Sequence, residues 1–269
     1  MHNRYFSYIG KDYTDLEQRT AEIKSALEQH PRDAELWLKY GLLMVEADEI
    51  DKSIQAFSQG LYYDPMNAQL RLQKGRRFIA KGQYWACISD IALAVKIDPN
   101  IWDNWYYLSV ALNLAEQYDE AAKTLERCRE ITLEKEHLFP VIDWMFVNLV
   151  EGGHKEEAQN LLNTFDCEIP CIQMDYSYKK RVKLFAGKIP PEEFYSIADI
   201  EENCLKRPNR VKLEQITQLF GLAFYYAYIK IDENKRNVAL KELIGIDMYH
   251  QGFGYIKGVK LAKERGILT

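Results

Sequence analysis

The chain has 269 residues, of which 47% are hydrophobic and 28% are charged, and its formal net charge is −5. This composition is typical of a folded globular protein and excludes a disordered or fibrous chain. No apolar run reaches the ~20 residues that a membrane-spanning helix needs. We therefore expect no membrane span, and the acidic balance disfavours a nucleic-acid partner.

The cysteines and the N-terminus both favour a cytoplasmic location. The cysteines are odd in number and scattered along the chain, which predicts reduced thiols and not a disulfide framework: Cys87, Cys128, Cys167, Cys171 and Cys204. Residues 1–11 mix charged and aromatic side chains and lack the apolar core of a secretory signal.

A 34-residue period organises the first half of the chain, and such a period is the signature of a repeat architecture. Several sets of residues share the spacing: Pro31, Pro65 and Pro99; Trp37, Arg71 and Trp105; Gly41, Gly75 and Ser109; Phe57, Ile91 and Leu125. The small residues fall in a first helix and the bulky ones in a second. Because a small residue lets a partner helix approach closely, each period predicts a helical hairpin.

The ends of the expected helices are also marked. Asp33, Asn67 and Asn100 stand before the first helices, where a side-chain oxygen caps free backbone amides. Short polar turns such as Asp48-Glu49 and Gly82-Gln83 separate the two helices of a pair. Strand patterns are absent, so we predict an all-α protein.

The stretch DAELWLKYGLLMVEADEIDKSIQAFSQGLYYDP resembles the tetratricopeptide repeat (TPR) family, with its large residue at Trp37, small residue at Gly41, aromatic Phe57 and terminal proline Pro65. Arg71 departs from this pattern by replacing the large apolar residue of the next repeat. The resemblance implies a right-handed α-solenoid of stacked helical hairpins, the TPR superhelix.

The predicted organisation has three parts. Residues 1–33 hold an N-terminal segment and capping helix, and residues 171–269 hold degenerate pairs and a C-terminal capping helix. Between them lie four regular repeats: 34–67, 68–101, 102–135 and 136–170. The last helix is expected to pack a stripe of apolar residues against the preceding helices and to keep a polar face toward solvent. The stripe is Phe253, Ile256, Val259 and Ala262, and the outer face is Lys257, Lys260, Lys263 and Glu264.

No chemistry-bearing motif stands out. Cys167 and Cys171 lack a second ligand pair at zinc-site spacing. The chain contains no phosphate-binding loop, nucleophile elbow or dinucleotide fingerprint. We therefore predict no metal, no cofactor and no enzyme. The alternative is an enzyme or enzyme subunit with a site in the irregular C-terminal half, since residues from distant repeats leave no local signature.

The family resemblance implies a scaffold or adaptor that binds a peptide or partner protein in a concave groove lined by first helices. The family's groove positions fall on Lys39, Leu42, Glu46, Gln69, Gln73, Arg76, Ile79, Tyr106, Tyr107, Val110 and Asn113, followed by Asp143 and Trp144. Leu38, Leu42, Gln73 and Tyr107 stand where the family's carboxylate clamp for chaperone tails needs polar or basic groups, so that clamp is absent.

Two basic clusters interrupt the acidic balance: Arg71, Lys74, Arg76 and Arg77, then Lys179, Lys180, Arg181 and Lys183. Basic clusters of this kind are a feature of nucleic-acid interfaces. They leave RNA as a minor alternative to a protein ligand.

Overall fold

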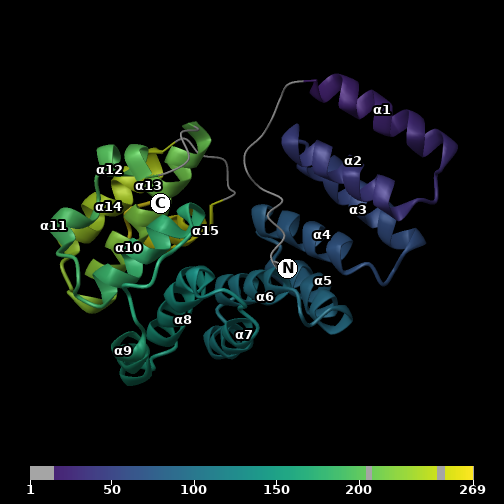
Figure 1. Cartoon of the computed structure of the whole chain (residues 1–269). Coiled ribbons are helices and arrows are strands. Elements are labelled where there is room, and N and C mark those ends of the chain that lie inside the picture. The colour runs from purple at the N-terminus through teal and green to yellow at the C-terminus, as the bar shows by residue number, and fades with distance from the viewer. Residues whose placement is uncertain (1–14, 204–207, 247–251, 269) are drawn as a thin grey trace. The chain divides into compact units, whose positions relative to one another are not determined.

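The computed structural model describes residues 15–203, 208–246 and 252–268, and over these residues the chain is helical without a strand (Figure 1). This confirms the prediction of an all-α protein. The chain divides into two compact units, residues 1–115 and 116–269. No helix of the described chain is both long and apolar enough to cross a bilayer. The predicted repeat boundaries stay a prediction.

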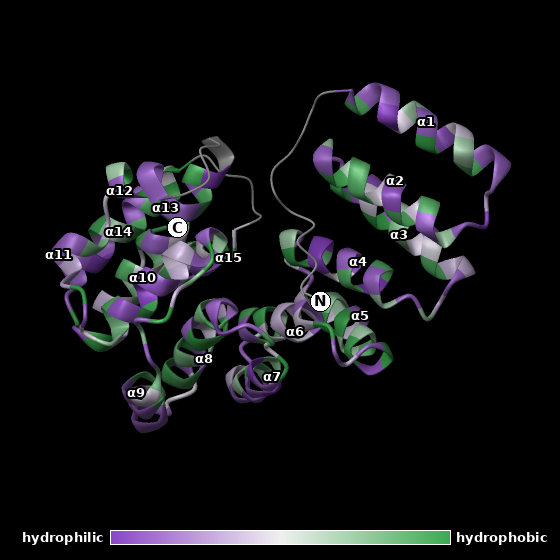
Figure 2. Cartoon of the chain, in the orientation of Figure 1, coloured by the Kyte–Doolittle hydropathy of each residue, from purple (hydrophilic) through white to green (hydrophobic). Residues whose placement is uncertain are grey.

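Unit 1, residues 1–115, is a stack of helical hairpins. Its helices are α1 (Leu16–Gln29), α2 (Ala34–Glu46), α3 (Ile50–Tyr63), α4 (Ala68–Ala80), α5 (Tyr84–Ile97) and α6 (Trp102–Leu114). Each helix packs against the next one, and α4 also contacts α6. Figure 2 shows hydrophilic residues predominating on α1, as a terminal helix of a solenoid needs. This arrangement confirms the predicted α-solenoid.

Unit 2, residues 116–269, begins with regular helices and becomes irregular. Its helices are α7 (Tyr118–Glu130), η1 (Lys135–His137), α8 (Phe139–Glu151), α9 (Lys155–Thr164), η2 (Gln173–Asp175), α10 (Tyr176–Phe185), α11 (Pro191–Phe194), α12 (Ile197–Asn203), α13 (Pro208–Phe224), η3 (Tyr225–Ile229), α14 (Glu233–Gly245) and α15 (Phe253–Glu264). Helix α8 packs on α7, α9 and α10, while α13 packs on α10, α14 and α15.

The small and bulky positions of the repeat meet as predicted. A methyl carbon placed on Gly41 would lie 2.3 Å from Cε1 of Phe57, and one placed on Gly75 would lie 2.5 Å from Cγ1 of Ile91. Phe57 and Ile91 have no solvent exposure. In these two hairpins the helices therefore approach so closely that a side chain at the glycine would displace the residue that faces it.

Two of the three predicted caps are present. The Asp33 carboxylate accepts from the amides of Glu35 and Leu36, and the Asn67 side chain accepts from the amide of Leu70. The third prediction is wrong. Ile101 holds the N-cap position of α6, two residues after Pro99, as Asp33 and Asn67 do after their own prolines, but its side chain has no hydrogen-bond acceptor; Asn100 lies one residue too early.

Arg71 forms the same hydrogen bond as the tryptophans at the equivalent positions of the neighbouring repeats. The indole Nε1 of Trp37 donates to the carbonyl oxygen of Pro31 at 2.9 Å, and Trp105 donates to Pro99 at 2.8 Å. Arg71 donates its Nε to the carbonyl oxygen of Pro65 at 3.0 Å. The position therefore requires a long side chain with a planar N–H donor, which indole and guanidinium share.

The predicted faces of the last helix are wrong in part. Lys257, expected on the outside, is only 3% exposed, and its Nζ lies 2.7 Å from Oε1 of Glu151 on α8. The buried stripe of α15 is Gly254, Lys257, Gly258, Leu261 and Ala262. The glycines explain this rotation. A methyl carbon on Gly258 would lie 2.8 Å from Leu243, so the helix approaches its neighbours most closely there.

Candidate functional site

The predicted groove positions on α2, α4 and α6 include five side chains that keep contact with solvent. They are Lys39, Leu42, Gln69, Arg76 and Tyr107, and we call them the first-helix face. Lys39 is exposed and the other four are half-buried. Since residues 34 apart take equivalent places in successive repeats, Leu42 and Arg76 share one register position and Lys39 and Tyr107 share another. All five belong to unit 1.

Five other predicted groove residues of unit 1 require correction, because the structure buries them: Gln73, Ile79, Tyr106, Val110 and Asn113. Tyr106 shares its register position with Leu38 and Leu72, and Ile79 and Asn113 share theirs with Val45. Each of these positions is buried in every repeat. Tyr106, Ile79 and Asn113 therefore hold core positions of the hairpin stack. Gln73 and Val110 share the register positions of the first-helix face, but in their own repeats these side chains are buried.

Arg76 and Tyr107 form the centre of the first-helix face. The guanidinium carbon of Arg76, on α4, lies 4.4 Å from the ring centroid of Tyr107, on α6. Its Nη1 donates to Oε1 of Gln73 at 3.4 Å. Tyr107 also meets Tyr106 edge to face, with ring centroids 5.4 Å apart, and Tyr106 stacks on Trp102. The buried Tyr106 and Trp102 thus pack beneath the half-buried pair of Arg76 and Tyr107.

Glu46, the remaining predicted groove residue of α2, is part of the fold at the end of that helix. Both of its oxygens bind the guanidinium of Arg19 on α1, at 2.9 and 3.1 Å. The two side chains are 27% and 38% exposed, respectively. Such a bidentate contact orients α1 against the last turn of α2.

The two predicted groove residues of unit 2 also require correction. Asp143 and Trp144 on α8 are buried, with 0% and 1% exposure. The ring of Trp144 stacks on Phe220 of α13 and meets Phe253 of α15 edge to face, with centroids 6.4 Å apart in both pairs. Helices from the C-terminal part of the unit therefore cover the positions that a groove ligand would need.

Sequence reasoning missed the partner of Asp143. Arg181 on α10 places its Nε 2.9 Å from Oδ1 of Asp143, and neither side chain is more than 1% exposed. Aromatic rings surround the guanidinium, with the centroid of Phe220 5.0 Å away. A side chain on Gly221 would collide with Arg181, since a methyl carbon there lies 2.6 Å from its Cγ. Nothing in the 34-residue period pairs these positions.

The raised pKa of the Asp143 carboxyl is expected to make the stability of the protein depend on pH. Burial raises the pKa of its carboxyl to about 7, against the opposing effect of Arg181. A raised folded-state pKa means that the folded chain binds the proton more tightly than the unfolded chain does. The contribution of Asp143 to the free energy of unfolding should therefore fall as the pH rises from 4 to 7, by at most about 1.4 kcal/mol per pH unit. Denaturant unfolding of wild type and Asp143→Asn across this range checks the result, and parallel curves would contradict it.

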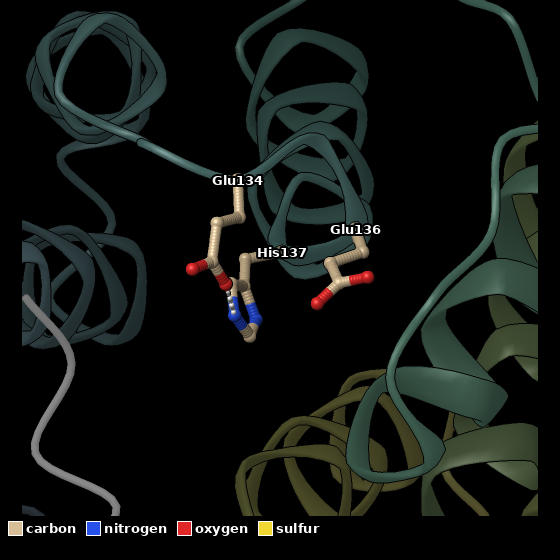
Figure 3. A group of neighbouring side chains, drawn as sticks. All are labelled: Glu134, Glu136 and His137. Carbon is tan, nitrogen blue, oxygen red and sulfur yellow. Dashed lines mark hydrogen bonds and ion pairs between the residues drawn. The ribbon is translucent and has the colours of Figure 1, made fainter. Parts of the chain in front are cut away.

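One group of side chains in unit 2 has the composition of a metal site. Glu134, Glu136 and His137 each offer a ligand atom, and these atoms lie within 4.8 Å of one another (Figure 3). His137 Nε2 is 2.9 Å from Oε2 of Glu134, and Nδ1 is 3.8 Å from Oδ2 of Asp175. Contacts with the carboxylates of Glu134 and Asp175 account for the orientation of the imidazole. We therefore assign no metal to it.

Carboxylates pair with two of the four cations in the first basic cluster and with three of the four in the second. Arg71 and Lys74 share Asp90, at 3.3 and 3.0 Å. In the second cluster, Lys180 pairs with Asp199 at 2.6 Å, Lys183 with Glu168 at 2.8 Å, and Arg181 with Asp143 as described above. A phosphate backbone would have to compete with these internal ion pairs.

Solved structures with the same fold are known. A crystal structure of MamA aligns with a TM-score of 0.52 at 15% identity, over 65% of this chain and 93% of the MamA chain. YrrB, a TPR protein with an unusual peptide-binding site, aligns with a TM-score of 0.50 at 16% identity, over 88% of this chain and 97% of its own. A tetratricopeptide repeat protein from Parabacteroides merdae aligns with a TM-score of 0.59 at 13% identity, over 94% and 96%.

These similarities show that the chain has the tetratricopeptide-repeat fold, which confirms the resemblance seen in the sequence. At 13–16% identity they show the fold alone. No protein-family model and no curated protein matches the chain. The function must therefore be argued from the residues of the chain itself.

Proposed function

We propose that this chain is a protein-interaction scaffold that binds an extended peptide segment of a partner on the first-helix face of unit 1. The observation that carries the proposal is the pair of Arg76 and Tyr107, which join α4 to α6 and keep contact with solvent. Stacked hairpins present their first helices as a continuous binding surface. The peptide-binding site of YrrB, which shares the fold, is consistent with this function.

The chemistry of the face suits a peptide. Arg76 carries a permanent charge and several N–H donors in one plane, which match carboxylates and backbone carbonyls. Tyr107 adds apolar area and a terminal hydroxyl, and arginine and tyrosine are enriched among residues that dominate binding energy. Lys39 and Gln69 extend the polar contacts, and Leu42 adds an apolar one. No catalytic group is needed in such a scaffold.

The proposal predicts the effect of removing the central pair. Peptides are selected from a random twelve-residue display library on the wild-type chain, and their affinities are measured by fluorescence anisotropy. Arg76→Ala with Tyr107→Ala should weaken the selected peptides at least about tenfold, because two hot-spot side chains are lost. Circular dichroism should change little, since both side chains are only half-buried and the buried residues beneath them are kept.

A matched control removes a basic residue and a tyrosine elsewhere. Lys52→Ala with Tyr62→Ala takes one cation and one tyrosine from the exposed side of α3, where Tyr62 is 76% exposed. This variant should bind the peptides as wild type does. If the control and the face variant bind equally, the ligand does not use the first-helix face.

An enzymatic site in the C-terminal half stays a prediction. Two buried titratable groups of unit 2 are Asp143 and His137, and both lie in buried contacts with charged neighbours. These contacts account for the positions of both groups, so we propose no reaction for them.

A further inference from the structure

Unit 2 contains a small, partly open cavity of about 30 Å³ that the proposed scaffold function does not use. Phe220 and Phe224 of α13 and Leu261 of α15 line it with apolar side chains, and polar groups complete its walls. One water molecule needs about 10–15 Å³ of such space, so the cavity accommodates about two waters or a ligand fragment of about two or three non-hydrogen atoms. Its ligand must therefore be small.

An irregular turn of helix contributes to the cavity wall. The π-helix η3 follows α13 directly, and its Tyr228 lines the cavity together with Tyr118 of α7. Turns of π-helix are rare and are frequent at functional sites. Burial raises the pKa of both phenol groups, so both keep their protons at neutral pH. The wall thus combines aromatic area with hydroxyl groups.

Lys257 of α15 supplies an amine at this cavity. Only 4% of its side chain is exposed, and its Nζ lies 2.7 and 2.8 Å from the two carboxylate oxygens of Glu151. The same Nζ is 5.5 Å from the ring centroid of Tyr118. Burial lowers the pKa of the amine, against the opposing effect of Glu151. A lysine of this kind is neutral more often than a solvated one, and the neutral amine is the form that attacks a carbonyl carbon.

The charges around the cavity disfavour an anionic ligand. Lys257 pairs with Glu151, while Lys260 pairs with Glu116 and lies 4.0 Å from Glu264. Carboxylates therefore outnumber the ammonium groups that they contact, so a further carboxylate or a phosphate would be repelled. A neutral electrophile meets no such repulsion. Aldehydes are neutral, and the smallest of them match the volume of the cavity.

We propose that Lys257 is a reversible covalent binding site for short-chain aldehydes, which enter the cavity and form an imine with Nζ. Glu151 first takes a proton from the ammonium group, and the neutral amine then adds to the carbonyl carbon. The new alkoxide oxygen takes a second proton from the nitrogen. Glu151 returns its own proton to the resulting hydroxyl group, which leaves as water. One ammonium group and one aldehyde thus give one iminium ion and one water, and the iminium ion keeps its ion pair with Glu151.

Lys180 of α10 is a matched control in the same unit. Its side chain is 11% exposed, and its Nζ lies 2.6 Å from Oδ2 of Asp199 and 5.6 Å from the ring centroid of Phe194. It shares the low exposure, the carboxylate partner and the aromatic neighbour of Lys257, but it does not line the cavity. A difference in reactivity between the two lysines therefore measures the effect of the cavity.

The test exposes the full-length wild-type chain to acetaldehyde and sodium cyanoborohydride at neutral pH. The reductant converts an iminium ion to a stable N-ethyl-lysine, and proteolysis with mass spectrometry gives the rate of labelling at each lysine. Lys257 should be labelled at least about tenfold faster than Lys180, because the cavity holds the carbonyl carbon beside Nζ. Circular dichroism before and after labelling checks that the fold is kept.

Two further measurements need no variant. Hexanal carries the same carbonyl group on a chain too long for the cavity, so it should show no preference for Lys257 over Lys180. With acetaldehyde, the ratio of labelling at Lys257 to labelling at the exposed Lys52 should fall as the pH rises from about 7 to 10. The hydrogen bond to Glu49 raises the pKa of Lys52, so its neutral fraction still increases where that of Lys257 levels off.

The proposal is overturned if acetaldehyde labels Lys257 no faster than Lys180. An equal preference for Lys257 with hexanal, or a ratio to Lys52 that stays constant with pH, overturns it as well. The cavity belongs to unit 2 and the first-helix face belongs to unit 1, so neither outcome bears on the peptide-binding function.

Discussion

Replacing Arg181 by leucine is expected to lower the free energy of unfolding at neutral pH by about 1–3 kcal/mol, because Asp143, whose pKa burial already raises to about 7, then takes up a proton and stays buried without its partner. Neither residue is more than 1% exposed, and no described hydrogen bond satisfies the Asp143 oxygens. Equilibrium denaturation in urea, followed by circular dichroism, measures the loss.

Two further variants test this explanation. Arg181→Met with Asp143→Leu removes both charges and should recover most of the lost stability, as apolar replacements of buried ion pairs often do. Arg127→Leu removes an exposed arginine that pairs with Glu130 at 2.6 Å, and should cost about 1 kcal/mol or less. A loss in Arg127→Leu as large as that in Arg181→Leu would contradict the role of burial.

Gly75→Leu is expected to lower the free energy of unfolding by about 1–3 kcal/mol, because overpacking forces α4 away from α5. The Cβ atom alone would lie 2.5 Å from Cγ1 of Ile91 and 3.4 Å from the backbone oxygen of Cys87. The isoleucine can shift to another rotamer, but the backbone oxygen can move only with its helix. A lower melting temperature in thermal denaturation measures the effect.

The matched control is another helical glycine. A side chain at Gly245, the last residue of α14, would meet no atom within 4 Å. Gly245→Leu should therefore leave the melting temperature almost unchanged. If Gly75→Leu also melts as wild type does, the close contact between the paired helices is not what stabilises this hairpin.

The sequence by itself determined the helical hairpin and its repetition. Contacts within a hairpin join residues close in the chain, and the same contacts recur every 34 residues. The contact between Gly75 and Ile91 can therefore be predicted from their positions in the repeat. Capping at Asp33 and Asn67 was predictable for a similar reason, because a side-chain oxygen reaches amides only two or three residues away. Local geometry is encoded in local sequence.

The solvent exposure of the predicted binding residues was harder to predict from the sequence. Lys39, Arg76 and Tyr107 keep solvent contact, whereas Gln73, at the same register position as Lys39 and Tyr107, is buried. Polar character favours the surface, yet Gln73 is buried, with its Oε1 accepting from Arg76 and its Nε2 without a hydrogen bond within the described part of the chain. Periodicity identifies equivalent positions and does not say how much of each side chain its neighbours cover.

Only the tertiary structure decided the interior of unit 2. Asp143 meets Arg181 and Glu151 meets Lys257 across separations that match no multiple of the period, and each pair joins helices whose order in space follows from the whole fold. A lysine on an amphipathic helix is normally solvated, yet Lys257 is buried because Gly254 and Gly258 let α15 approach its neighbours and Glu151 supplies the opposite charge. The energy of such a pair depends on burial and distance together, and neither exists until the helices have packed.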